Sequence, residues 1–360
     1  MTIVYLVLLI IALLLSGFGW SKKLKKINAP LSWFFIYTFS ILIGFRSQYS
    51  GVDTKEYYKY FNDISDRITP YFTFEPGFTF FTLFMTEITT VEVYIFVLSF
   101  IQLLFIYLSA KVLKITNGLL TVVVYLSFIP GFDMLTNGIR GGMTLSISLL
   151  FLSLTVISKN KLAVLNFIPS VMHASTVIVA VASIFTKKFA HVKINTLIFS
   201  LNLTFFILWL FINPLSLLDV FSKTSKEVGY LGTLIRYLII EKELMSFSVK
   251  LYFICLSILF SLLYFLTLKY NKESRADGIL TRLAFIGLST QFIYALFSFS
   301  QYSYRFMFLA YPLQLLMFCY IMDKYYSGVH RNLIIFSICF LGLITTYSTK
   351  TFSSFKLLSL

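Results

Sequence analysis

Long apolar segments separated by short polar loops recur from one end of this chain to the other. Each is close to the roughly 20 residues that an α-helix needs to cross a bilayer. They lie near residues 3–19, 31–45, 76–90, 92–110, 118–136, 139–158, 161–185, 193–212, 250–269, 279–299, 304–323 and 332–348. This pattern predicts an all-α polytopic membrane protein, with one integral membrane domain over residues 1–360.

Two of these segments are not typical of simple spans. Segment 76–90 begins with Pro76, which suits the first position of a helix. One face of this segment carries a polar stripe of Thr79, Thr82 and Thr86. The opposite face carries an apolar stripe of Phe78, Phe81, Phe84 and Ile88. We expect this helix to lie on the outer membrane surface or to dip into it. Segment 161–185 has lysines at both ends and Pro169 and His173 in its middle, which favours a broken hairpin whose middle points outward.

Lysine clusters at residues 22–26, 111–114 and 187–193 predict the topology, because cytoplasmic loops are enriched in Lys and Arg. With these clusters inside, the chain makes about ten crossings and both termini lie outside. Two external loops result, one at 46–90 that contains the interfacial helix and one at 213–248.

Composition narrows the possible functions. The chain is 58% apolar with a mean hydropathy of +0.85 and has no polar stretch long enough for a soluble domain. Its net charge of +15 comes from residues at span ends, where they orient helices, so a nucleic-acid partner is not predicted. The cysteines lack CxxC spacing and the three histidines are scattered, so neither a metal site nor a disulfide framework is indicated. No nucleotide-binding motif is present.

The polar stretch 46–58 follows an apolar segment directly. It places Arg46, Asp53 and Tyr57 just outside the membrane. Asp53 with Glu56 is typical of a helix start, so Asp53 is a capping residue, a general base or a group that holds a sugar hydroxyl. Tyr57, Phe61 and Ile64 share one face of that helix.

Three further residues carry candidate chemistry. Glu75 precedes Pro76, where it either interacts with the helix dipole or acts as a base. Arg140 lies among glycines near the outer boundary, where it either binds phosphate while the backbone approaches a ligand closely or belongs to a simple hairpin with its side chain extended to the membrane surface. His173 lies within an apolar segment. Its side chain is either a packing residue or a functional one, as a general base or a phosphate ligand.

Two more arginines map to the same outer face. Arg236 lies in the second external loop, where it binds lipid headgroups or the substrate, and Arg305 opens a span beside Tyr302. Tyr302, Tyr304 and Tyr311, which lie near Arg305 in the sequence, also fit an aromatic belt. Together the arginines, carboxylates and tyrosines indicate a site for an anionic lipid headgroup that bears sugar. The donor must already be activated, because no domain for using nucleotide energy is found.

Four short elements, taken in order, resemble a known family. They are Arg46 with GVDT and Tyr57, EPGF from Glu75, NGIR ending at Arg140, and HAS from His173. They are similar to elements of the bacterial O-antigen and exopolysaccharide repeat-unit polymerases of the Wzy/EpsG type. Those polymerases often have Gln after the arginine, whereas this chain has Gly141.

This resemblance implies a GT-C-like membrane glycosyltransferase of the bacterial cytoplasmic (inner) membrane that needs no cofactor. It would transfer a growing glycan from undecaprenyl diphosphate to a hydroxyl of the next lipid-linked repeat unit, on the outer face. A chain-length regulator is an expected partner, and lipopolysaccharide is one destination. The expected roles are diphosphate binding by Arg46, Arg140 and Arg305, a clamp at Arg236, sugar stacking by Tyr57 and Tyr302, and a base among Asp53, Glu75 and His173.

Two other readings stay open, a flippase or transporter of lipid-linked oligosaccharide and a glycan ligase that uses the same donor. Transporters usually carry internal repeats and polar residues at the middle of several spans. The polar residues here gather at one face, which favours an enzyme.

Overall fold

A computed structural model describes residues 2–18, 22–50, 53–68, 74–158, 161–211, 247–297 and 303–347. The regular elements in these ranges are helices, which confirms the predicted all-α class. The chain groups into two compact units, residues 1–184 with 315–360 and residues 185–314. The single membrane domain predicted over residues 1–360 stays a prediction.

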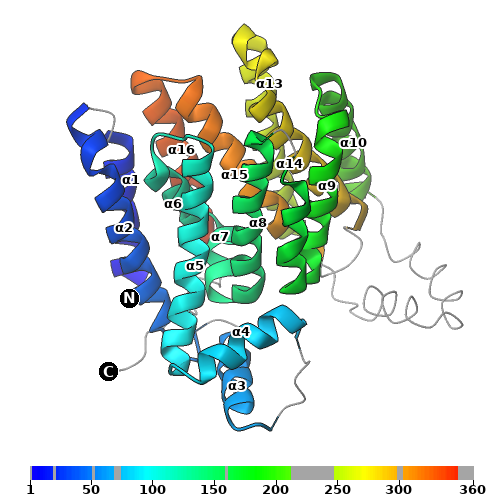
Figure 1. The fold of residues 1–360 in the computed structure, drawn as a ribbon. Coiled ribbons are helices and arrows are strands. Elements are labelled where there is room, and N and C mark those ends of the chain that lie inside the picture. Colours follow the sequence, from blue (N-terminus) through cyan, green and yellow to red (C-terminus); the bar gives the residue numbers. More distant parts are fainter. Residues whose placement is uncertain are drawn as a thin grey trace, which may run out of the picture. The chain divides into compact units, whose positions relative to one another are not determined.

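The first unit holds most of the helices (Figure 1). They are α1 (Thr2–Phe18), α2 (Lys22–Gly44), α3 (Thr54–Ser65), α4 (Pro76–Thr86), α5 (Val91–Val112), α6 (Gly118–Ser127), α7 (Ile129–Thr136), α8 (Ile139–Ile157), the 3₁₀ helices η1 (Ala163–Val171) and η2 (Ala174–Thr176), and α16 (Gly328–Tyr347). The second unit holds α10 (Val192–Phe211), α13 (Phe247–Tyr270), η4 (Lys272–Ala276) and α14 (Gly278–Phe297). Helices α9 (Val177–Phe189) and α15 (Ser303–Lys324) each contribute to both units.

The hydropathy pattern locates these helices closely, because most begin and end within a few residues of a predicted segment. Four are long and apolar enough to cross a membrane, namely Ile27–Gly44, Val91–Val112, Ile139–Ile157 and Gly328–Thr346, and the bent pair α6–α7 makes up to five. Four shorter apolar helices accompany them in the described ranges. These helices fit a multi-pass membrane protein, and the count of about ten crossings stays a prediction.

The structure corrects two of the predicted segments. Residues 118–136 were expected to form one apolar span, but α6 and α7 are bent by 86° at Phe128. Pro130 lacks the amide hydrogen that would continue α6, and Gly131 lies where a Cβ would be 1.9 Å from the carbonyl oxygen of Tyr125. Helix α2 also begins earlier than its apolar segment, at Lys22 within the lysine cluster.

Helix α5 packs against both α2 and α8 in the first unit. Ring contacts pair Trp33 with Tyr107 and Tyr37 with Phe96, so α2 and α5 run antiparallel. A Cβ on Gly44 would lie 2.4 Å from the Cα of Phe96, so only glycine permits this close crossing. The end of α2 therefore meets the start of α5, and α3 and α4 extend from this end of the helices (Figure 1).

Helix α4 is held by hydroxyl groups. The side-chain oxygens of Thr79 and Thr82 each lie 2.9 Å from a tyrosine hydroxyl, of Tyr60 and Tyr94 respectively. The predicted helix is confirmed, but its threonine stripe does not lie opposite all of the predicted apolar residues. The threonines face the protein, while Phe78 is buried and the outward face is formed by Phe80, Phe84 and Ile88, each at least 60% exposed. The hydroxyl groups of the buried tyrosines give Thr79 and Thr82 hydrogen-bond partners inside the protein, so these threonines can face inward.

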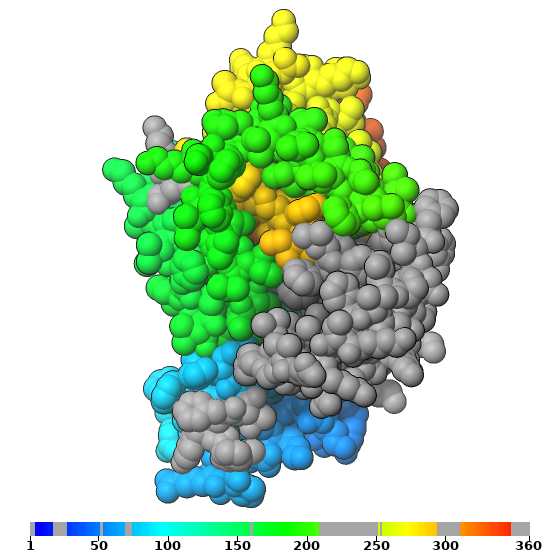
Figure 2. Space-filling model, turned by 90° about the vertical axis from the view of Figure 1, so that its right-hand side faces the viewer, coloured from blue at the N-terminus to red at the C-terminus, as the bar shows by residue number. Residues whose placement is uncertain are grey.

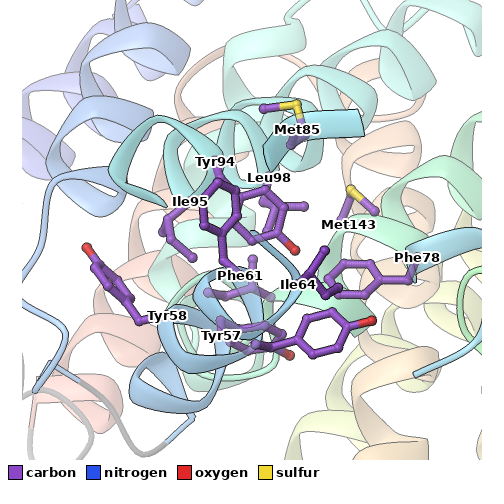
Figure 3. Close-up of a cluster of buried hydrophobic side chains, with 12 residues drawn as sticks. Tyr57, Tyr58, Phe61, Ile64, Phe78, Met85, Tyr94, Ile95, Leu98 and Met143 are labelled. Atoms are coloured by element: carbon purple, nitrogen blue, oxygen red, sulfur yellow. The ribbon is translucent and has the colours of Figure 1, made fainter. Parts of the chain in front are cut away.

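A buried aromatic cluster joins α3 and α4 to α5 and α8 (Figure 3). Tyr57, Phe61 and Ile64 all point into it, which confirms the predicted apolar face of α3. Tyr94 from α5 and Phe78 from α4 complete its centre. In the space-filling view, the blue segment that contains α3 and α4 lies directly against green segments of the chain (Figure 2). This cluster fixes α4 against the first turn of α8.

The second unit contains a row of buried amides between α10 and α14. The side-chain nitrogen of Asn195 donates to the Thr281 carbonyl oxygen at 3.1 Å, and that of Asn202 donates to the Leu288 carbonyl oxygen at 3.1 Å. These bonds seven residues apart fix how α10 and α14 align. They give hydrogen-bond partners to the two side-chain nitrogens, which would be costly to leave unbonded among apolar side chains.

Candidate functional site

Glu75, Arg140 and His173 meet in the structure, and we call them the Glu75 cluster. Nη1 of Arg140 donates to Oε2 of Glu75 at 2.6 Å, and Nδ1 of His173 lies 3.0 Å from Oε1. The backbone N–H of Ala174 also donates to Oε1, at 3.2 Å. One carboxylate therefore joins an arginine 65 residues away to a histidine 98 residues away.

Helix α4 begins in a way that presents Glu75 to the other two residues. Glu75 is the N-cap, yet its side chain makes no capping hydrogen bond, so its carboxylate extends away from α4. Pro76 follows at the first helical position and donates no amide hydrogen, which suits the start of a helix. A Cβ on Gly77 would lie 2.9 Å from the carbonyl oxygen of Val171, so glycine lets the start of α4 approach the chain just before His173.

Arg140 lies in the first turn of α8, held by aromatic side chains. Its backbone N–H donates to the Tyr57 hydroxyl at 3.3 Å, and its guanidinium lies over the Phe74 ring, 4.2 Å from the centroid. Such a cation–π contact stabilises the charge and fixes the plane of the guanidinium. Glu75 accepts a hydrogen bond from Nη1 of Arg140 only. Among the described residues, Nε and Nη2 of Arg140 have no hydrogen-bond acceptor. These two donors can bind a ligand.

His173 occupies the break between η1 and η2. Its backbone is extended (φ −157°, ψ 110°), its N–H donates to the Pro169 carbonyl oxygen, and its own carbonyl oxygen accepts from Thr176. The predicted break in segment 161–185 is confirmed, while its outward orientation stays a prediction. An ionised carboxylate at Nδ1 requires that nitrogen to donate, which leaves a lone pair on Nε2 in the neutral ring. About a quarter of the side chain is exposed (26%).

The charge of Glu75 follows from its two partners. Burial alone would raise its pKa, but the hydrogen bond from His173 and the positive charge of Arg140 outweigh burial and lower the pKa to about 2. The carboxylate is therefore ionised at neutral pH and accepts protons poorly. Its geometry and charge suit it to orient His173 and Arg140.

Arg46, predicted to bind diphosphate, is fully buried. Nη1 donates to the Ile43 carbonyl oxygen at 2.7 Å, Nη2 donates to the Thr136 carbonyl oxygen at 2.7 Å, and Nε and Nη2 both reach Oγ1 of Thr54. Burial lowers its pKa to about 10, so it stays charged at neutral pH. In this conformation Arg46 ties the end of α2 to the start of α3 and the end of α7. Its diphosphate role stays a prediction.

Asp53 and Tyr57 lie at the start of α3. The helix begins at Thr54 with Asp53 as its N-cap, as predicted, but the Asp53 side chain makes no capping hydrogen bond. The backbone carbonyl oxygen of Asp53 accepts from the N–H groups of Glu56 and Tyr57. The Tyr57 ring is buried against Phe74, with centroids 6.3 Å apart, so it forms a wall beside Arg140. A catalytic role for Asp53 and sugar stacking by Tyr57 both stay predictions.

Three other predicted residues are not placed against the cluster. Arg236 and Tyr302 lie outside the described residues, as does nearly all of the second external loop at 213–248. Arg305 lies in the first turn of α15, and its side chain is outside the described atoms. Within the described ranges, no group of three or more His, Cys, Asp or Glu side chains could hold a metal ion.

Sequence reasoning missed two residues near the cluster. Phe74, which lies under the guanidinium of Arg140, had no sequence signal beyond its place before Glu75. Asp133 gave a signal, because a carboxylate inside an apolar segment is functional by default. Its side chain accepts a short hydrogen bond from Asn137, and its carbonyl oxygen accepts from the backbone of Asn137 and Gly138. Asp133 therefore shapes the turn that leads to Arg140.

Comparison with models of protein families matches residues 31–359 to the EpsG family. The match spans nearly the whole chain and includes all three residues of the Glu75 cluster. A search of curated proteins and a search of solved structures found no match.

Proposed function

We propose, from the premise that this chain belongs to the EpsG family of Wzy-type polymerase-like proteins, that it is a membrane glycosyltransferase that polymerises polysaccharide repeat units. It transfers a growing glycan from undecaprenyl diphosphate to a hydroxyl of the next lipid-linked repeat unit. One observation carries this proposal. The Glu75 cluster holds an arginine with available donors beside a histidine that has an available basic nitrogen.

Arg140 serves the leaving group. When the bond between the sugar and the diphosphate breaks, its electron pair moves onto a diphosphate oxygen, where negative charge develops. Nε and Nη2 of Arg140 can bind two phosphate oxygens in a fork while Nη1 stays on Glu75. Phe74 and Glu75 fix the guanidinium beforehand, so little reorganisation is needed as the charge develops.

His173 serves the acceptor. Its Nε2 takes the proton of an acceptor hydroxyl while that oxygen forms the new bond to the anomeric carbon. Glu75, bound to Nδ1, stabilises the imidazolium that results. His173 is favoured over Glu75 as the base, because the pKa of Glu75 is about 2.

The expected location agrees with this chemistry. The cluster lies at the end of the helices where α5 begins, and Lys111 in the last turn of α5 lies at the other end. Since lysine clusters mark the cytoplasmic side, the cluster faces the outer side of the bacterial cytoplasmic membrane. There it meets lipid-linked oligosaccharide that is already activated, and a chain-length regulator can act on the growing product.

An elongation assay tests the proposal. Purified protein in liposomes is given undecaprenyl-diphosphate-linked repeat units, and the products are separated by gel electrophoresis. We expect a ladder of longer glycans and release of undecaprenyl diphosphate. Movement of the lipid between leaflets without a new glycosidic bond would support a flippase instead. Transfer only to an acceptor other than a repeat unit would support a ligase.

A further inference from the structure

Three glycines around Arg140 have different surroundings. A Cβ on Gly138 would meet only the Cα of Met134, at 3.9 Å. A Cβ on Gly142 would lie 2.5 Å from Oε1 of the buried Gln102, so that glycine is needed for packing. A Cβ on Gly141 would instead meet Cδ2 and Nε2 of His173, at 3.4 and 3.5 Å. Gly141 alone faces the reactive edge of the histidine.

The orientation of His173 explains this contact. Nδ1 is bound to Glu75, so Nε2 lies on the side of the ring away from the carboxylate, beside Gly141. No described residue hydrogen-bonds Nε2, and the side chain is partly exposed, so a ligand can reach this edge. A contact of 3.4 to 3.5 Å is ordinary for a methyl group, so alanine fits at position 141. A longer side chain starting from that Cβ would extend along the edge that carries Nε2.

We propose that the bare backbone of Gly141 forms the acceptor subsite, where a sugar hydroxyl of the lipid-linked repeat unit approaches Nε2 of His173. A small residue is needed there because the incoming sugar ring occupies the space that a longer side chain would fill. Gly141 thus determines access for the acceptor and takes no part in proton transfer. This inference rests on the proposed function.

The donor side is separated from this space. Neighbouring residues of a helix point about 100° apart around its axis. The Arg140 side chain is directed to Glu75 and Phe74, whereas the Cα of Gly141 faces His173. A larger residue at 141 should therefore leave diphosphate binding unchanged while it excludes the acceptor.

The test compares Gly141→Ala and Gly141→Leu with Gly138→Leu as the matched control, because a Cβ at Gly138 lies in nearly open space. Each variant in liposomes is measured for elongation of lipid-linked repeat units and for binding of undecaprenyl diphosphate. We expect Gly141→Ala and Gly138→Leu to keep most of their elongation. Gly141→Leu should lose about a hundredfold, as expected when reacting groups are displaced by about 1 Å, and should bind undecaprenyl diphosphate like the wild type.

Each result has a distinct meaning. Wild-type elongation by Gly141→Leu would overturn the inference and leave the proposed function standing. Loss of both elongation and undecaprenyl diphosphate binding would also overturn it, because position 141 would then shape the donor site or the fold. A changed pH profile of the residual elongation would show that leucine displaces His173, which again contradicts an access role. Failure of the wild-type protein to elongate at all would count against the proposed function itself.

Discussion

Replacing Glu75 by glutamine removes the negative charge that lies between Arg140 and His173 and keeps the shape of the side chain. The amide presents one oxygen and one NH₂ group, so it cannot accept from both Arg140 and His173 as the carboxylate does. Nδ1 is then no longer held as the donor, and the imidazolium formed during proton transfer loses its counter-charge. We expect elongation to fall about 10²- to 10⁴-fold, the range found when the orienting carboxylate of a histidine base is neutralised.

The effect on stability is smaller and has a defined pH dependence. A pKa lowered from 4.5 to about 2 corresponds to about 3 kcal/mol. Because 24% of the side chain is exposed, solvent screening reduces this contribution to about 1 to 2 kcal/mol. The folded pKa lies below the unfolded value, so this stabilisation is fully present above pH 4.5 and is lost as the pH falls towards 2. Glu75→Gln protein should therefore still fold at neutral pH.

The assay is elongation in liposomes at equal amounts of folded protein, with thermal unfolding in detergent as the measure of stability. Glu87→Gln is the matched control, because Glu87 lies at the other end of α4 and is exposed. The control should elongate like the wild type. Wild-type elongation by Glu75→Gln, with the variant folded and inserted, would refute the role of the bridging carboxylate.

Three other predictions concern Arg140, Arg46 and the membrane topology. Arg140→Ala should lower elongation about a hundredfold or more, and Arg140→Lys should also be poor because an ammonium lacks the forked contact to phosphate; normal polymer from Arg140→Ala at wild-type protein level would remove this residue from the site. Arg46→Met should cost about 3 kcal/mol of stability, because it leaves the Ile43 carbonyl oxygen without its guanidinium donor and removes the hydrogen bonds that join Arg46 to Thr54 and Thr136, while undecaprenyl diphosphate binding per folded molecule is unchanged. A stable Arg46→Met variant that fails to bind undecaprenyl diphosphate would instead support a direct diphosphate contact. A cysteine at Ser65 in α3 should react with a membrane-impermeant reagent only from the outer side, and labelling only from the cytoplasm would overturn the topology.

Local sequence signals predicted the helices and named the cluster residues. Apolar runs of bilayer length located α5, α8 and α10 within one or two residues, because a helix in lipid must satisfy its own backbone and its apolar length is set by the membrane. Arg140 and His173 were identified because ionisable side chains are rare in and beside membrane-spanning segments. Pro130 was a local signal for the bend between α6 and α7. The apolar segment 118–136 continues through it, so hydropathy alone predicted one span.

Only the tertiary structure decided what these residues do to one another. The sequence offered Glu75 as a possible base, and its contacts with Arg140 and His173 hold it ionised, which suits it to orient these two residues. The sequence placed the threonines of α4 in a stripe opposite Phe78, but Thr79 and Thr82 bind tyrosines from α3 and α5 on the buried side of α4, where Phe78 also lies. Hydropathy and helical period act over a few neighbouring residues, while these contacts join residues up to 98 positions apart. Such contacts depend on how whole helices pack, with glycines such as Gly77 setting the distance of approach, and no local pattern encodes that packing.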